Sequence, residues 1–296
     1  MIQNIDLIKK NIYLDAAIVN ANNELSILSA KNAFELGLIN PYLIGNINII
    51  KKILININWS SIEEERLISS NSEAESAEIA CKLASSNKVR LIVKGHMHSD
   101  IMMAEYIKSE HQLLTKGVRM SHLWLLTFDD EKGPLIITDG ALNIMPSLRT
   151  KQSIVRNSIN FSVKLDNFKP KVAILSATEK TLDSLASSLE AEKIERWAQK
   201  EFPDIPVSGP LAFDNAISLE AAQIKGNVDE VTGHANILVM PNIETGNAIV
   251  KVMVNYLNAT AGGFVVGSKV PVVITSRSHN IDSRISSICN AILSMN

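Results

Sequence analysis

Residues 73–96, EAESAEIACKLASSNKVRLIVKGH, place a helical pattern directly before a short apolar run. The helical stretch, 73–86, begins with acidic residues, which suit the start of a helix. Its small apolar side chains recur at helical spacing, and they are Ala77, Ala80, Cys81 and Ala84. The run 89–93, VRLIV, predicts a buried strand that ends at Lys94-Gly95. A helix that leads at once into a buried strand is typical of an α/β fold with a largely parallel sheet.

The same alternation recurs on both sides of this stretch. The sequence predicts helices at 22–37, 181–200, 212–225, 245–257 and 282–294, and strands at 41–45, 171–176, 236–240, 263–267 and 270–275. The middle of the chain differs, because the apolar runs 122–128 and 134–138 flank a polar turn, DDEKG. This pattern predicts a hairpin, and we expect a second domain to begin near residue 117.

Composition narrows the class of protein. The chain has 296 residues, enough for one large or two moderate domains, and 46% of them are apolar, which excludes a disordered chain. Lys and Arg (29) nearly balance Asp and Glu (31), so neither a general nucleic-acid coat nor a polybasic membrane anchor is indicated. The two cysteines are far apart, so neither a disulfide framework nor a cysteine-rich zinc site is indicated. No apolar run approaches the roughly 18 residues of a membrane span. We expect a cytoplasmic protein without nucleic-acid or membrane partners.

Polar and small residues follow the predicted strands, at the edge where open α/β sheets bind ligands. They are Lys94-Gly95-His96, Thr138-Asp139-Gly140, Pro241-Asn242 and Thr275-Ser276-Arg277, and the helix starts add Asp214-Asn215 and Thr245-Gly246-Asn247. Taken singly, each group is better explained by simple capping and turn formation. Together they predict a ligand site at the carboxyl ends of the strands.

Two of these groups suit an anion. Gly246-Asn247 is predicted to open a helix whose free N–H groups could hold phosphate, although Thr245 as an ordinary N-cap explains the spacing equally well. Ser276-Arg277 places a hydroxyl beside a guanidinium, which suits bidentate binding of phosphate, and Asp282 follows at the start of the last helix. A helix cap with a surface ion pair is the alternative.

Other catalytic patterns are weak. His96 and His98 form an H-x-H pair for which the sequence identifies no third metal ligand, and His122 lies in an apolar strand, as core histidines do. The chain contains neither HExxH nor GxSxG, so the usual zinc-protease and serine-hydrolase classes are not indicated. Cys81 lies on an apolar helix face, where a packing role is expected.

Several stretches, taken in order, resemble the phosphate acetyl/butyryltransferases. They are KGHMHSD (94–100), LIITDGALNIMPSL (135–148), KVAILSATE (171–179), SGPLAFDNAISLEAAQIKG (208–226), ANILVMPNIETGN (235–247) and GFVVGSKVPVVITSR (263–277). The resemblance runs from about 14 to 294 and is strongest to the butyryltransferase branch and to the acyltransferase half of bifunctional enoyl-CoA hydratase/phosphate acetyltransferase proteins.

The resemblance implies reversible transfer of a short acyl group between coenzyme A and phosphate, with CoA as a substrate and no tightly bound cofactor or metal. It implies two α/β domains with a cleft between them, similar to isocitrate and isopropylmalate dehydrogenases, and a homodimer. The expected domains are 1–116 plus 266–296, and 117–265. The substrates would be acyl-CoA, phosphate and acyl phosphate.

The resemblance also assigns residues. The family's catalytic Ser-Arg pair falls on Ser276 and Arg277, and its downstream acid falls on Asp282, which would accept the thiol proton. The residues expected to position CoA or phosphate are Lys94, Asp139, Asn143, Asp214 and Asn247. The chain departs from the family where it has Ala104, Asn255 and Ser283. Fewer guanidinium groups for phosphate leave open a catalytically weak CoA-binding paralogue, and the shared fold leaves open a dehydrogenase of the isocitrate/isopropylmalate type.

Overall fold

The computed structural model describes residues 8, 12–128, 133–275 and 280–295. The chain divides into two compact units. Unit 1 comprises Met1–Val118 and Gly262–Asn296, and unit 2 comprises Arg119–Ala261. The sequence analysis placed the corresponding breaks at 117 and 266.

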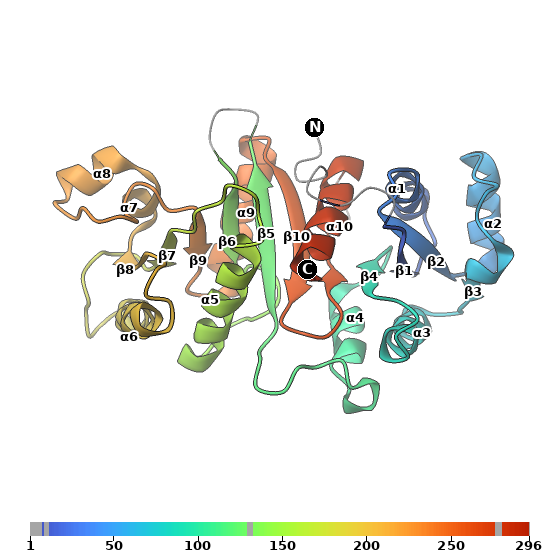
Figure 1. Ribbon diagram of the computed structural model, residues 1–296, viewed down its shortest axis with the longest axis horizontal. Helices are drawn as coiled ribbons and strands as arrows, with labels where there is room; N and C mark the ends of the chain where they lie inside the picture. The colour runs from blue at the N-terminus through green and yellow to red at the C-terminus, as the bar shows by residue number, and fades with distance from the viewer. Residues whose placement is uncertain (1–7, 9–11, 129–132, 276–279, 296) are drawn as a thin grey trace. The chain divides into compact units, whose positions relative to one another are not determined.

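Unit 1 is built on a mainly parallel sheet with helices on both faces (Figure 1). Its strands, in spatial order, are β3 (Leu67–Ser69), β2 (Ile39–Gly45), β1 (Leu14–Val19), β4 (Leu91–Lys94), β11 (Val272–Val273) and most of β10 (Thr260–Val266). The pairs from β3 through β11 are parallel, whereas β10 runs antiparallel to β11. Its helices are α1 (Glu24–Glu35), α2 (Ile47–Asn56), α3 (Glu73–Ser85), α4 (Ser99–Tyr106), α10 (Ile281–Met295), and the 3₁₀ turns η2 (Glu64–Arg66) and η3 (Ser109–His111).

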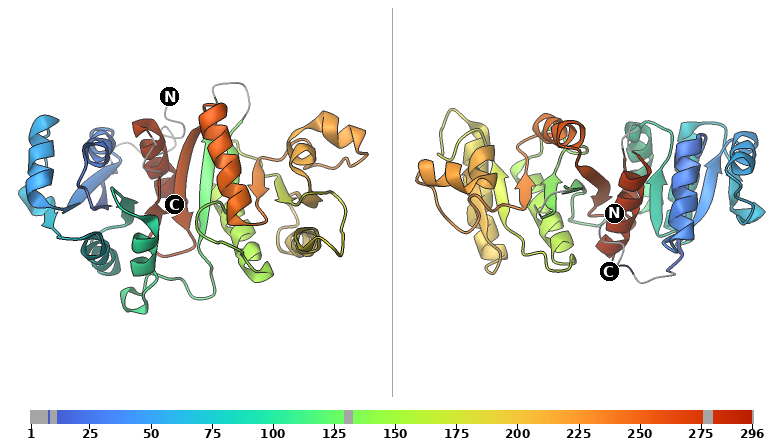
Figure 2. Two further views of the ribbon diagram at one scale, coloured as in Figure 1. Left: turned by 180° about the vertical axis from the view of Figure 1, so that it is seen from behind. Right: turned by 90° about the horizontal axis from the view of Figure 1, so that it is seen from above.

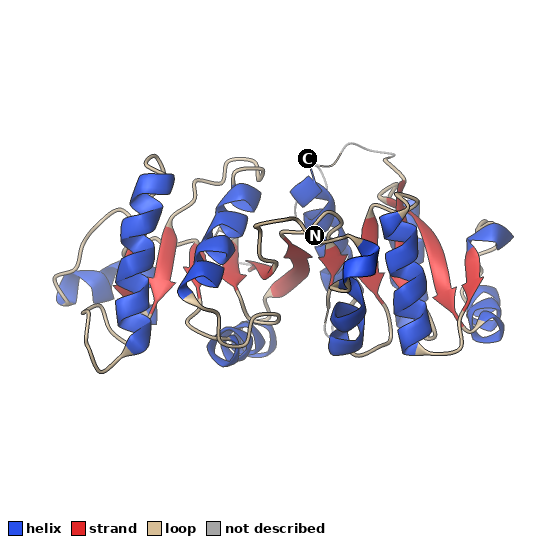
Figure 3. Ribbon diagram, turned by 90° about the horizontal axis from the view of Figure 1, so that it is seen from below, coloured by secondary structure: helices blue, strands red, loops and turns tan. Residues whose placement is uncertain are grey.

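Unit 2 repeats the α/β plan with a hairpin at one side of its sheet. Its strands, in spatial order, are β5 (Ser121–Thr127), β6 (Leu135–Thr138), β9 (Ile237–Val239), β7 (Val172–Leu175) and β8 (Val207–Leu211). Strands β5 and β6 are antiparallel, and the pairs from β6 to β8 are parallel. Its helices are α5 (Leu148–Ser162), α6 (Ala186–Glu201), α7 (Phe213–Ile217), α8 (Leu219–Ile224) and α9 (Ile243–Tyr256). Figures 2 and 3 show the helices of each unit flanking its strands.

The predicted α/β class with a largely parallel sheet is therefore confirmed, and so is the predicted hairpin. One predicted element is wrong. The single helix expected over 212–225 is broken at Ser218, whose backbone is extended (φ −122°, ψ 113°). The Ser218 side chain accepts a hydrogen bond from the Ala221 backbone N–H at 3.2 Å and starts a new helix. Serine competes well for such cap positions, which explains the break.

The predicted apolar face of α3 is buried against the sheet of unit 1. Ala77, Ala80 and Cys81 are fully buried, and Ala84 is nearly so. These short side chains let α3 lie close to β1, β2 and β4. The full burial of Cys81 confirms its predicted packing role. Burial also raises the pKa of the Cys81 thiol to about 12, which argues against a reactive thiolate. In the described part of the chain, no helix has both the length and the apolar character needed to cross a bilayer.

The core strand β1 provides a test of how much this burial stabilises the protein. Ile18 of β1 is 1% exposed, whereas Ile55 of α2 is 75% exposed. We expect Ile18→Ala to lower the free energy of unfolding by about 2–5 kcal/mol, because it removes buried apolar surface and leaves a cavity. The matched substitution Ile55→Ala should change it by no more than about 0.5 kcal/mol. Urea unfolding of both variants measures the difference, and equal effects would contradict the assignment of β1 to the core.

Candidate active site

Neighbouring parallel strands of unit 1 end at one edge of its sheet. Val19 of β1 lies opposite Lys94 of β4, and Val273 of β11 lies opposite Val93. After β11 the chain continues to Thr275, which is buried. The predicted catalytic residues Ser276 and Arg277 come next and lie outside the described residues. The segment that leads to them thus leaves the sheet at the edge where β4 ends in Lys94.

The turn after β4 holds Lys94 tightly. Lys94 is only 3% exposed, and its Nζ donates a hydrogen bond to the Met97 carbonyl at 3.0 Å. The Gly95 N–H donates to the Val19 carbonyl at 2.8 Å, and a Cβ added to Gly95 would lie 2.4 Å from that same oxygen. Only glycine permits so close a crossing of the β1 and β4 ends. The glycine therefore helps fix the turn that carries the Lys94 ammonium group.

The H-x-H pair that follows has other contacts. The His96 N–H donates to the Asn20 carbonyl at 3.0 Å, and the His98 N–H donates to Oε2 of Glu73 at 3.1 Å. Among the described residues, the group whose side chains could jointly hold a metal is Glu105, Glu110 and His111, which includes neither member of the pair. The pair thus ties the turn after β4 to its neighbours.

Asp282, the predicted base, lies in the first turn of α10 and is exposed. The preceding Asn280 accepts a hydrogen bond from the Ser283 N–H at 2.9 Å through its side chain, so it caps the helix. A carboxylate in the first turn is favoured by the helix dipole. The sequence analysis missed the cap, although Asn three residues before Ser283 is a recognisable signal.

In unit 2, Asp139 organises the turn that follows β6. It is 2% exposed, and its carboxylate accepts hydrogen bonds from the backbone N–H groups of His122 (3.0 Å), Ala141 (2.9 Å) and Leu142 (2.9 Å). Nδ2 of Asn143 donates to the same carboxylate at 2.7 Å. Both Asp139 oxygens are engaged, so two of the predicted site residues meet as a buried network.

Asn247, a third predicted residue, joins this turn from α9. Its Nδ2 donates to the Gly140 carbonyl at 3.2 Å. Gly140 and Gly246 touch through their backbones, since a Cβ on Gly246 would lie 2.7 Å from the Gly140 Cα. The structure therefore brings Asp139, Asn143 and Asn247 together where β6 ends and α9 begins.

The interpretation of Gly246-Asn247 as a helix opening with free N–H groups is wrong, and so is Thr245 as the cap. Helix α9 begins earlier, at Ile243, and Asn242 caps it. Oδ1 of Asn242 accepts from the Thr245 N–H at 2.9 Å, and the Gly246 N–H donates to the Asn242 carbonyl at 3.3 Å. These N–H groups are already paired, and Gly246 serves the close approach to Gly140. An Asn directly after Pro241 was the available signal for this cap.

Asp214 belongs to a different set of contacts. It is exposed in the first turn of α7, and Nζ of Lys225 donates to its Oδ1 at 2.9 Å. The Glu179 Oε2 lies 3.8 Å from the same Nζ. The hydrogen bond from Lys225 lowers the pKa of Asp214 below its ordinary value. The sequence analysis missed Lys225 and Glu179, because these contacts join positions far apart in the sequence.

Comparison with known proteins identifies the family of the chain. Residues 69–292 match the family model described as phosphate acetyl/butaryl transferase. The chain is 36% identical to the phosphate acetyltransferase of Rickettsia prowazekii (strain Madrid E), over 92% of this chain and 78% of that protein. It is 31% identical to the phosphate butyryltransferase of Clostridium acetobutylicum, over 94% of this chain and 92% of that protein.

Solved structures are similar over nearly the whole chain. A branched-chain phosphotransacylase from Enterococcus faecalis V583 has a TM-score of 0.78 at 29% identity, with 96% of this chain and 99% of that chain covered. A 4-hydroxythreonine-4-phosphate dehydrogenase from Klebsiella pneumoniae has a TM-score of 0.56 at 11% identity, with 97% of this chain and 100% of that chain covered. This likeness shows a shared fold alone. The expected dehydrogenase-like fold is thereby confirmed. By its family model and its relatives, the chain belongs to the phosphate acetyl/butyryltransferase family and is an acyltransferase.

Proposed function

We propose that this protein catalyses the reversible reaction of a short-chain acyl-CoA with inorganic phosphate to give an acyl phosphate and free CoA. The observation that carries the proposal is the 36% identity to a phosphate acetyltransferase over 92% of the chain. The buried Lys94 at the carboxyl edge of unit 1 supports it, since a desolvated ammonium group suits an anionic substrate. Acetyl is the proposed acyl group, because identity to the acetyltransferase exceeds the 31% to the butyryltransferase.

The proposed mechanism is direct transfer in a ternary complex. In the direction of acyl-CoA synthesis, Asp282 accepts the proton of the CoA thiol, whose ordinary pKa of about 8.5 leaves little thiolate at neutral pH. The thiolate sulfur attacks the acyl carbonyl carbon, a C–S bond forms, and the bond from that carbon to the phosphate oxygen breaks. Ser276 donates a hydrogen bond to the developing oxyanion, and Arg277 pairs with the departing phosphate. The exposed position of Asp282 at the start of α10 is compatible with this proton transfer.

The residues of unit 2 have two proposed roles. Asp139 has both oxygens engaged, so we assign it to positioning the turn that presents Asn143 and Asn247. The half-buried amides of Asn143 and Asn247 would bind polar groups of CoA or phosphate. Asp214, charged and exposed, would accept hydrogen bonds from CoA. The protein is proposed to act in the cytoplasm as a homodimer.

The ion pair of Asp214 makes a pH prediction. Because the folded-state pKa of Asp214 is lowered, its pair with Lys225 stabilises the fold above the ordinary carboxyl pKa, and this contribution is lost as the pH falls through the folded-state pKa. Lys225→Met should raise the pKa of Asp214 toward its ordinary value, as measured by NMR titration of the side-chain carboxyl. Lys51→Met, which removes an exposed ion pair with Glu64 in unit 1, is the control and should leave the pKa of Asp214 unchanged. An unshifted Asp214 in the Lys225 variant would refute the pairing.

The activity itself is tested by assaying acyl transfer to CoA. We expect loss of free CoA thiol when the purified protein is mixed with CoA and acetyl phosphate, and smaller rates with propionyl and butyryl phosphates. A thiol reagent follows the reaction, and omission of each substrate is the control. Faster reaction with butyryl phosphate would reassign the acyl group. Absence of transfer with all three acyl phosphates would overturn the proposed function.

Arg277 is the residue whose removal should weaken the binding of phosphate most. Arg277→Ala should raise the KM for phosphate and lower kcat/KM about tenfold to a hundredfold or more, because a charge-assisted hydrogen bond of about 1.5–3 kcal/mol is removed. The control is Arg196→Ala, which removes an exposed arginine on α6 that pairs with Glu192. Steady-state kinetics in the direction of acyl phosphate synthesis measure both variants. Unchanged kinetics for Arg277→Ala would remove it from the mechanism.

A further inference from the structure

A cavity of about 470 Å³ lies in unit 1 at the edge of the sheet opposite to Lys94. Its lining includes Arg90 and Pro271, the residues directly before β4 and β11. Lys94 ends β4 four residues after Arg90, which at the usual rise places the two ends of the strand about 13 Å apart. The cavity is therefore separate from the edge where β4 ends in Lys94, and its size suits a small organic ligand.

The cavity walls are held in place by the fold. The Lys269 N–H donates to the Leu113 carbonyl at 2.9 Å, and Leu114 forms a bridge with Ser268. Tyr106, the last residue of α4, is fully buried, and its hydroxyl donates a hydrogen bond to the Val270 carbonyl. These contacts connect α4 and the segment after η3 to the turn between β10 and β11. A cavity built from interlocked segments is largely formed before a ligand arrives.

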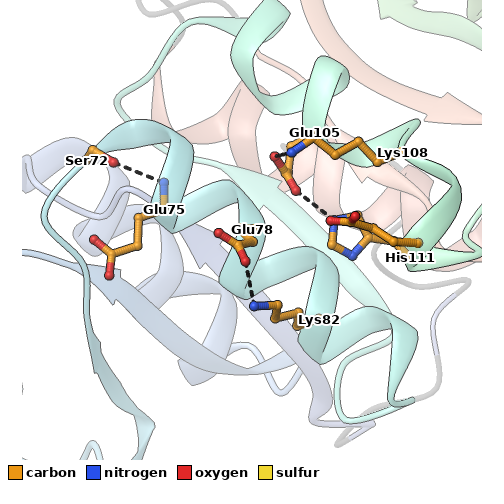
Figure 4. Close-up of polar contacts among 8 residues, drawn as sticks. Ser72, Glu75, Glu78, Lys82, Glu105, Lys108 and His111 are labelled. Carbon is orange, nitrogen blue, oxygen red and sulfur yellow. Dashed lines mark hydrogen bonds and ion pairs between the residues drawn. The ribbon is translucent and has the colours of Figure 1, made fainter.

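One wall is set by polar contacts around the buried Glu105, shown in Figure 4. His111 lines the cavity and is 3% exposed, and its Nε2 lies 2.7 Å from Oε1 of Glu105. The other oxygen of Glu105 lies 2.7 Å from Nζ of Lys108. Both Glu105 oxygens are thus engaged by cationic or hydrogen-bonding partners, which disfavours a metal ion at this group. The network instead fixes the position of His111 at the cavity wall.

The charge on the lining has one sign. Arg90 and Lys269 are exposed to the cavity, and the described lining includes no aspartate or glutamate. Neither cation forms a side-chain hydrogen bond or an ion pair with another described residue, and the same holds for the side chains of Ser85, Asn87 and Gln112. Side chains that can form hydrogen bonds therefore line the cavity from three segments of the chain. Two unneutralised cations favour an anionic ligand.

Polar side chains of the lining complement the two cations. Ser85 is the last residue of α3, Asn87 follows it, and Gln112 follows η3. Hydroxyl and amide groups both donate and accept hydrogen bonds, so they suit the hydroxyl groups of a ligand. A ligand that satisfies both parts of the lining carries an anionic group and hydroxyl groups.

We propose that this cavity binds a phosphomonoester that also carries hydroxyl groups, such as a sugar phosphate or a nucleoside monophosphate. Arg90 and Lys269 hold the phosphate group, and Ser85, Asn87 and Gln112 bind the polar remainder. The strands β4 and β11 run from this cavity to the opposite edge, so the bound ligand would also stiffen the strands that carry Lys94 and lead to Thr275.

Isothermal titration calorimetry at low ionic strength tests the proposal, with glucose 6-phosphate and adenosine 5′-monophosphate as probes. Glucose and adenosine are the uncharged controls, and each titration is repeated with saturating CoA. We expect at least one phosphomonoester to bind with and without CoA, and its Kd to rise about tenfold or more in Arg90→Gln and in Lys269→Gln. Lys52→Gln, which removes an exposed cation on α2 outside the cavity, should leave the Kd unchanged.

Four outcomes would overturn the proposal. The first is that neither phosphomonoester binds the wild-type protein, and the second is that CoA displaces the bound probe. The third is a Kd that neither cavity variant changes. The fourth is a loss of affinity in Lys52→Gln as large as the loss in the cavity variants. Thermal unfolding of each variant verifies that it is folded, and the two cavity variants are independent should one of them fail to fold. Absence of acyl transfer would leave these results interpretable, because binding is measured without turnover.

Discussion

The parallel pairing of β11 with β4 is the constraint on which the strand-end edge of unit 1 depends. Strand β11 consists of Val272 and Val273, both fully buried, held between β4 and β10. A pairing of two residues contributes few hydrogen bonds, so burial of these side chains and the anchoring of the flanking segment must keep it in register. Through that register the chain reaches Thr275 at the edge where β4 ends. The same short strand separates this edge from the cavity at its other end.

Unit 2 depends on a different constraint, the backbone contact of Gly140 with Gly246. A side chain on either glycine would separate the turn after β6 from the first turn of α9. Asp139 stabilises this arrangement from within, since burial of a carboxylate is tolerated when hydrogen-bond donors surround both oxygens. The amides of Asn143 and Asn247 are consequently presented from a rigid support. Rigid support is what substrate positioning requires.

Parts of this structure were predictable from local patterns. The hairpin of β5 and β6 follows from two apolar runs around a polar turn, and the buried face of α3 follows from helical spacing. Strand β1, the centre of the sheet in unit 1, was missed because Asp15, Ala16 and Ala17 are poor strand formers. Its burial between β2 and β4 overrides that propensity, and such tertiary effects leave no local signal.

The candidate site also has parts that the sequence predicts and parts that it does not. Positions at strand ends, such as Lys94 and Asp139, could be predicted because strand ends follow from apolar runs and share one edge. The partners of those residues could not, since the contact of Asn247 with Gly140 joins segments far apart in the sequence. The role of Gly246 was misassigned for this reason: its local pattern resembles an anion-binding helix start, and only the three-dimensional packing shows that its N–H is already paired.

The fold by itself does not determine the reaction, because the same two-unit α/β plan also occurs in a dehydrogenase. Under the proposed function, the groups that follow its strands distinguish this chain. In the proposed mechanism, the ammonium group of Lys94 and the Ser276-Arg277 pair would provide positive charge and a hydroxyl donor for a phosphoryl group, and the Asp282 carboxylate would provide a proton acceptor. Acyl transfer between a thiol and phosphate needs those three functions and no hydride acceptor. The proposed chemistry therefore depends on a few residues that follow strand ends, and the rest of the fold serves to position them.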